Sequence, residues 1–174
     1  MERVRKKVCI VVGTRPEAIK MAPVALQVRQ RPELECFLLA TGQHTQMLKQ
    51  ALEHFGLRAN VDLNVMKDRQ TLDYLTAAVL EGVGQALDSN RPDIVLVHGD
   101  TTTTFAASLA AFYRKIPVGH VEAGLRSRNL YLPFPEEMNR LLTDRISSLW
   151  FAPTEGAHRN LVLEGIPPER AFVT

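Results

Sequence analysis

The sequence predicts an α/β protein with a mainly parallel sheet that is covered by helices on both faces. Short runs of apolar, often β-branched residues recur along the 174 residues, and segments with helical spacing of apolar side chains separate most of them. Parallel strands need a long crossover connection, which is usually a helix, so this alternation favours parallel pairing. The runs are apolar at nearly every position, which is typical of strands buried on both faces.

The individual elements follow from these two patterns. The expected strands are residues 8–13, 35–41, 93–99, 116–123, 149–154 and 171–174, with a weaker strand at 60–65. The expected helices are 71–90, 102–115 and 135–146, with a less regular one over 17–28. Arg114 and Lys115 suit the negative end of a helix, and Pro135 suits a first helical position. Because Pro23 interrupts the segment 17–28, we expect that helix to be kinked or to begin late.

Composition limits the class of partner and the cellular location. The 21 basic and 19 acidic residues give a net charge of +2, which is too balanced to indicate nucleic acid or a membrane as the main partner. No apolar run approaches the roughly 20 residues that a membrane span needs. The basic start runs into Gly13 without a small-residue cleavage site, and Cys9 and Cys36 lie in apolar runs as reduced thiols would. We expect a cytoplasmic protein and, because the chain ends on an apolar strand, a piece of a longer one.

The segment after the first strand could bind an anion. It reads GTRPEAIK over 13–20 and contains neither the dinucleotide fingerprint GxGxxG nor a Walker A loop. Gly13 permits a tight turn, and Arg15 and Lys20 place cations beside a helix start, where a diphosphate is favoured. A turn glycine with two solvated cations explains the same residues equally well.

Acidic residues follow the next strands in a repeated pattern. Asp100 follows the strand 93–99, and Glu122 stands at the end of the strand that comes next. His98 precedes Asp100 by two residues and His120 precedes Glu122 by two, so each pair shares a strand face. We therefore expect two histidine–acid pairs at one sheet edge, with Asp100 both starting its helix and facing a ligand.

A third acid, Glu136, begins the following helix and could converge with Asp100 and Glu122 on one crevice. Clustered carboxyl groups push their pKa values apart, which is what acid–base chemistry needs. A metal site competes with this interpretation, but no HxxxH-like spacing is present. A serine nucleophile is not indicated, because the sequence has no GxSxG elbow. Two polar segments, 41–48 and 67–72, could contact a sugar nucleotide or simply be surface.

Six motifs together resemble a known family. They are GTRPEAIKMAP, TGQHTQML, VHGDTTTT, GHVEAGLRS, PFPEEMNRLLTD and FAPT, in this order along the chain. They resemble the N-terminal half of bacterial non-hydrolysing UDP-N-acetylglucosamine 2-epimerases. The resemblance implies that residues 1–174 form a Rossmann-like domain, one half of a glycosyltransferase-B-like two-domain fold. The second domain, which completes the UDP pocket, is absent from this chain.

The resemblance also implies an activity and roles for particular residues. Family members interconvert UDP-N-acetylglucosamine and UDP-N-acetylmannosamine without a cofactor, through elimination and re-addition of UDP, and act as homodimers. A second UDP-N-acetylglucosamine activates bacterial members. The catalytic carboxylates match Asp100, Glu122 and Glu136; the cations near the nucleotide match Arg15, Lys20 and Arg140; the activator contacts match Gln43, His44, Gln46, Arg69 and Gln70. A hydrolysing epimerase that releases N-acetylmannosamine, and an inactive half-domain that only binds the sugar nucleotide, remain alternatives.

Overall fold

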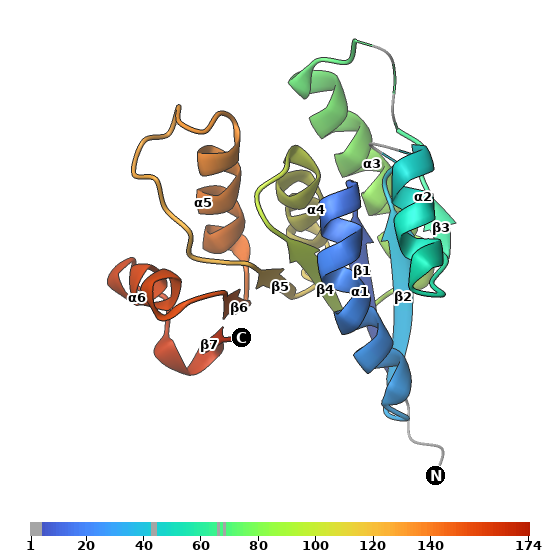
Figure 1. Ribbon diagram of the computed structural model, residues 1–174, viewed down its shortest axis with the longest axis horizontal. Coiled ribbons are helices and arrows are strands. Elements are labelled where there is room, and N and C mark those ends of the chain that lie inside the picture. Colours follow the sequence, from blue (N-terminus) through green and yellow to red (C-terminus); the bar gives the residue numbers. More distant parts are fainter. Residues whose placement is uncertain (1–4, 43–44, 66, 68) are drawn as a thin grey trace.

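The computed structural model describes residues 5–42, 45–65, 67 and 69–174, without the side chain of Thr45. Within these residues, seven strands form one parallel sheet in the order β3-β2-β1-β4-β5-β6-β7 (Figure 1). The strands are β1 (Lys6–Val12), β2 (Leu34–Ala40), β3 (Val61–Asp62), β4 (Ile94–His98), β5 (Val118–Val121), β6 (Leu149–Ala152) and β7 (Ala171–Val173). The predicted fold class and all seven predicted strands are confirmed.

Helices cover both faces of the sheet. They are α1 (Arg15–Gln30), α2 (Thr45–His54), α3 (Leu72–Asn90), α4 (Thr102–Tyr113), α5 (Glu136–Ile146) and α6 (Glu155–Leu163), with a short 3-10 turn at Pro168–Arg170. Apolar side chains of α1 and α2 pack on one face of β1 and β2, and those of α3 and α4 pack on the other. In Figure 1, α5 lies beside α4, and α6 continues this layer toward β6 and β7. No helix in the described part of the chain is both long and apolar enough to cross a bilayer.

One of the two alternatives predicted for the first helix is wrong, and two helices were missed. The helix α1 begins at Arg15 and continues through Pro23, so it does not start late. Thr14 and Glu17 form a capping box there, which fixes the helix start independently of the proline. The helices α2 and α6 were not predicted. For α6 a signal existed, because the Thr154 side chain caps the helix at Ala157 N.

The register between β4 and β5 decides where the two histidines point. Val97 pairs with His120, and His98 pairs with Val121. Paired residues of parallel neighbours point to the same face, and successive residues alternate. His98 and His120 therefore lie on opposite faces of the sheet, although both stand near its carboxyl edge.

The two cysteines also lie on opposite faces. Cys9 packs with the cluster that includes Phe37, and Cys36 packs at the edge of the cluster under α1. Both thiols are free, as predicted. Cys9 is fully buried, and this burial raises the pKa of its thiol to about 12, whereas Cys36 is only partly buried.

Candidate active site

The candidate site lies where the carboxyl ends of β1, β4 and β5 meet. These strands are direct neighbours, so the segments that follow them share one edge of the sheet. Asp100 comes two residues after β4, and Glu122 comes directly after β5. The first turn of α1 follows β1 and carries Arg15, Glu17 and Lys20. Open parallel sheets bind ligands outside the carboxyl ends of their strands, so this edge is the first place to look for chemistry.

Glu122 is held by two cationic or hydrogen-bonding partners from different elements. His98 Nε2 lies 2.8 Å from Glu122 Oε2, and Lys20 Nζ forms an ion pair with the same oxygen. The hydrogen bond from His98, assisted by Lys20, lowers the pKa of Glu122 to about 2 against the opposing effect of burial. Glu122 is therefore an ionised carboxylate near neutral pH, with a quarter of its side chain exposed.

Asp100 is tied to α5 rather than to its own helix. Arg140 forms an ion pair with the Asp100 carboxylate, and Asn139 Nδ2 donates to the Asp100 carbonyl oxygen at 2.9 Å. The cap of α4 is Thr101, whose side chain accepts from Thr104 N. The expectation that Asp100 starts this helix is therefore wrong: the next residue does so, and the Asp100 carboxylate faces α5.

Glu136 reaches the same edge through helix geometry. It is the first residue of α5, four residues before Arg140, and side chains at this spacing lie on one helix face. Arg140 extends to Asp100, so Glu136 lies on the face of α5 that is turned toward the end of β4. Its buried Oε2 has no hydrogen-bond partner among the described residues. The predicted grouping of Asp100, Glu122 and Glu136 around one rim is thus compatible with the fold.

The three predicted diphosphate-binding cations differ in their surroundings. Lys20 and Arg140 are paired with Glu122 and Asp100 respectively. Arg15 is exposed at the first position of α1, where the helix dipole favours an anion. It borders a hollow of about 470 Å³ between α1 and α2.

Of the five predicted activator residues, the structure describes Gln46, Arg69 and Gln70. Gln43 and His44 fall outside the described residues. Gln46 is exposed in the first turn of α2, and Arg69 is exposed with a left-handed backbone before α3. Gln70 is used locally, because its Oε1 accepts from Lys67 N at 3.2 Å. These positions follow β2 and β3 rather than β4 and β5.

Glu17 is a buried carboxylate that the sequence interpretation passed over. Its oxygens accept from Gly13 N, from Thr14 N at 3.0 Å and from Thr101 Oγ1 at 2.6 Å. Burial raises its pKa above the ordinary value, against these hydrogen bonds. Glu17 joins the loop after β1 to the loop after β4. The capping-box pattern TRPE was the signal for its local role, but nothing in the sequence indicated the bond to Thr101.

The second histidine belongs to a buried network on the opposite face. His120 Nδ1 lies 2.6 Å from Asp144 Oδ1, and its Nε2 lies 2.7 Å from the Gly99 carbonyl. Burial opposes the charge on Asp144, but His120 and Arg126 together hold its pKa below the ordinary value. The predicted pairs His98–Asp100 and His120–Glu122 are therefore wrong, because the strand register separates the histidines and brings His98 to Glu122.

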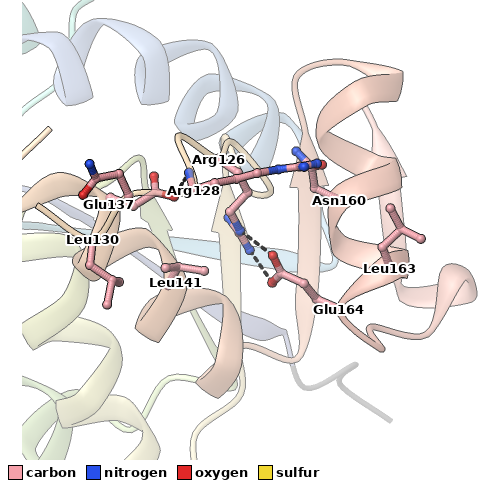
Figure 2. A pocket seen from close by; sticks show the side chains of 9 residues that line it. Arg126, Arg128, Leu130, Glu137, Leu141, Asn160, Leu163 and Glu164 are labelled. Atoms are coloured by element: carbon pink, nitrogen blue, oxygen red, sulfur yellow. Dashed lines mark hydrogen bonds and ion pairs between the residues drawn. The ribbon is translucent and has the colours of Figure 1, made fainter. Parts of the chain in front are cut away.

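The network continues to a hollow between α5 and α6. Arg126 forks onto Glu164 at 2.7 and 2.8 Å and donates to Asp144 at 2.7 Å. Figure 2 shows this fork on the wall of a hollow of about 340 Å³. Glu137 Oε1, on the same wall, accepts from Ser127 N and Arg128 N and so fixes the loop that leads to α5. No group of three or more metal-ligating side chains occurs in the described part of the chain.

The fold and the charged rim define a class of protein: a Rossmann-like domain of the glycosyltransferase-B type. The structure of MurG from Acinetobacter baumannii has a similar fold, with a TM-score of 0.60 at 15% identity. At this identity the likeness concerns the fold and nothing further. Residues 26–174 match the family model described as UDP-N-acetylglucosamine 2-epimerase, so the chain belongs to that family.

Individual relatives agree over nearly the whole chain. The UDP-N-acetylglucosamine 2-epimerases of Neisseria meningitidis and Bacillus subtilis are each 54% identical over 168 residues, which is 97% of this chain. The Neisseria enzyme bound to UDP-GlcNAc superimposes with a TM-score of 0.94, and 97% of this chain matches 45% of that one. The Methanocaldococcus jannaschii enzyme, in complex with UDP-GlcNAc and UDP, gives 0.89 at 40% identity, over 96% of this chain and 46% of its own. The chain spans 44% and 45% of the Bacillus and Neisseria relatives.

Proposed function

We propose that this chain is the carboxylate-bearing, N-terminal half of a two-domain enzyme that interconverts UDP-N-acetylglucosamine and UDP-N-acetylmannosamine. The observation that carries the proposal is the charged rim, where Asp100 and Glu122 end neighbouring strands and Glu136 begins the helix tied to Asp100. This chain spans 45% of the Neisseria relative, and a second domain in the remaining length completes the site.

The reaction explains why carboxylates and cations gather there. The hydrogen on sugar carbon 2 is not adjacent to a carbonyl and is therefore hard to remove directly. The bond from carbon 1 to the UDP oxygen breaks first, UDP leaves with the electron pair, and carbon 1 gains cationic character. A carboxylate then takes the proton from carbon 2, which gives 2-acetamidoglucal. Return of a proton on the other face and re-addition of UDP complete the change, so no cofactor is needed.

The charges of the rim residues assign each of them a role in this reaction. Glu122, ionised at neutral pH, stabilises the cationic sugar ring. Arg15, at the N-terminus of α1, and Lys20 neutralise the departing diphosphate. Asp100 and Glu136 come from different elements and serve the removal and return of the proton.

Three finer features rest on the resemblance. A second UDP-N-acetylglucosamine contacts Gln43, His44, Gln46, Arg69 and Gln70 as an activator. Gln46 and Arg69 support this by their exposure in the segments that follow β2 and β3. The enzyme acts as a cytoplasmic homodimer. Sedimentation of the complete enzyme and a sigmoidal rate curve against substrate concentration test the dimer and the activator.

A chimera tests the activity. This chain replaces the matching first part of the Bacillus subtilis relative, with which it shares 54% identity. We expect turnover of UDP-N-acetylglucosamine in D2O to give UDP-N-acetylmannosamine with deuterium at carbon 2, observed by NMR. Free N-acetylmannosamine as the main product would favour the hydrolysing alternative instead. Asp100→Asn should lower turnover at least about 100-fold, which is typical of a lost acid–base group.

Two controls complete the design. Asp88→Asn changes an acid on α3 that pairs with Arg114, so it should leave turnover unchanged. Calorimetry on the 174-residue chain alone should show weak binding of UDP-N-acetylglucosamine and no turnover. Rapid turnover by that chain would show that the proposed site lacks nothing from a second domain, which contradicts the two-domain proposal.

A further inference from the structure

Glu122 has a backbone conformation that is sterically unfavourable for a residue with a side chain. Its φ is 67°, in the left-handed region that residues with a side chain seldom adopt. Such conformations cluster at functional sites and persist only where the surroundings hold them. The turn after β5 therefore needs contacts that fix the Glu122 side chain.

His98 supplies one of these contacts from the neighbouring strand. The imidazole is 6% exposed, and its Nε2 lies 2.8 Å from Glu122 Oε2. Lys20 reaches the same oxygen from α1. The carboxylate is thus held by a buried donor on β4 and by a half-exposed donor on α1.

The remaining surroundings of His98 indicate that Glu122 is the target of its polar group. His98 Nδ1 is buried and has no hydrogen-bond partner among the described residues. The charge interaction with His98 opposes the burial that raises the pKa of the nearby Glu17, whose hydrogen bonds come from Gly13, Thr14 and Thr101. Asp100, beyond the turn, is paired with Arg140. His120 differs, because both of its ring nitrogens have partners.

We propose that His98 is a positioning residue whose Nε2–H holds Glu122 in its left-handed conformation and in its ionised form at the rim. The catalytic consequence rests on the proposed function, but the effect on Glu122 itself does not. The direction of the Glu122 pKa agrees, because the hydrogen bond from His98 is the largest cause that lowers it, ahead of Lys20.

Carbon-13 NMR of the glutamate side chains tests the proposal on the 174-residue chain without any turnover. The carboxyl signal of Glu122, assigned through Glu122→Gln, is followed as pH falls. His98→Phe fills the space but removes the donor, so the Glu122 midpoint should rise by about one pH unit or more. His98→Gln places an amide donor near the old Nε2 and should restore part of the low midpoint. His158→Gln, a change of a histidine on α6, should leave it unchanged.

The outcomes separate cleanly. A folded His98→Phe variant with the wild-type Glu122 midpoint would overturn the proposal, as would equal midpoints for the Phe and Gln variants. If His98→Phe does not fold, the wild-type chain provides the test. The NMR signals of the His98 ring should then shift at the pH of the Glu122 midpoint. Ring signals that do not change at that pH would overturn the proposal. A moved midpoint together with an inactive chimera would leave the positioning role standing and remove only the proposed function.

Discussion

Two histidines near the ends of the neighbouring strands β4 and β5 each pair with a carboxylate, yet the two pairs lie in different surroundings. His98 meets Glu122 at the rim, where the carboxylate is partly exposed and its backbone is strained. His120 meets Asp144 on the opposite face, where both side chains are fully buried and their remaining polar atoms are bonded. The first pair leaves part of its carboxylate exposed to solvent, and the second pair is enclosed in the core of the fold.

The two pairs show that similar tripeptides can place their histidines in different surroundings. The tripeptides HGD and HVE look alike in the sequence. Successive strand residues alternate between faces, and the register of β4 against β5 places His98 and His120 on opposite sides. The Glu122 carboxylate at the rim remains partly exposed, because its contacts within the fold do not cover it completely.

Disruption of the buried His120–Asp144 pair should lower the stability of the protein most. Asp144→Ala removes the acceptor shared by His120, Arg126 and Gly124 N. Breaking a buried ion pair strands its partners, so the free energy of unfolding should fall by about 3–5 kcal/mol. Urea denaturation measures this. A loss below about 1 kcal/mol would show that the network is dispensable.

The matched change at the rim should spare the fold and damage the chemistry. Glu122→Gln keeps the shape but removes the negative charge that we assign to stabilising the sugar cation. In the chimera, turnover should fall about 100-fold or more. Urea denaturation should show a smaller loss of stability than Asp144→Ala causes, since the Glu122 side chain is partly exposed. Similar stability losses for Glu122→Gln and Asp144→Ala would erase the contrast between the two pairs.

Two glycines provide a finer test of the two regions. Both Gly99 and Gly124 have left-handed φ values, of 72° and 84°. A Cβ on Gly99 meets nothing within 4 Å, whereas one on Gly124 comes within 2.3 Å of the Ala157 carbonyl oxygen. Gly99→Ala should therefore cost only the conformational strain of about 1–2 kcal/mol. Gly124→Ala should cost clearly more in the same denaturation experiment, and the reverse order would contradict the close approach of Gly124 to Ala157 on α6.

The smallest effect concerns pH. The pKa of Glu122 is lowered from 4.5 to about 2, so its ionised form stabilises the fold above pH 4.5, and this contribution is lost as pH falls through about 2. Glutamine does not titrate, so the stability advantage of wild type over Glu122→Gln at neutral pH should shrink across this window. Thermal unfolding of both proteins at a series of pH values measures the difference. A constant difference would show that the folded and unfolded states bind the Glu122 proton equally.

Local sequence patterns were enough to predict the alternation of strands and helices, the parallel sheet and the edge at which we propose that the ligand binds. Local patterns sufficed for this, because the apolar period and the capping residues act within a few positions. They also placed Asp100 and Glu122 at strand ends. The same patterns could have revealed α6 through Thr154, and they did place Pro23 inside a helical segment.

The contacts between residues on different strands and helices depended on the folded arrangement of the chain. In the register of β4 against β5 the two histidines are offset by one residue, so His98 pairs with Glu122 and His120 pairs with Asp144. The packing of α5 brings Arg140 to Asp100. The bond from Thr101 to Glu17 spans 84 positions and has no local signature. Such pairings depend on strand register and helix packing, which are set by contacts between segments far apart in the chain, so no single segment carries the information.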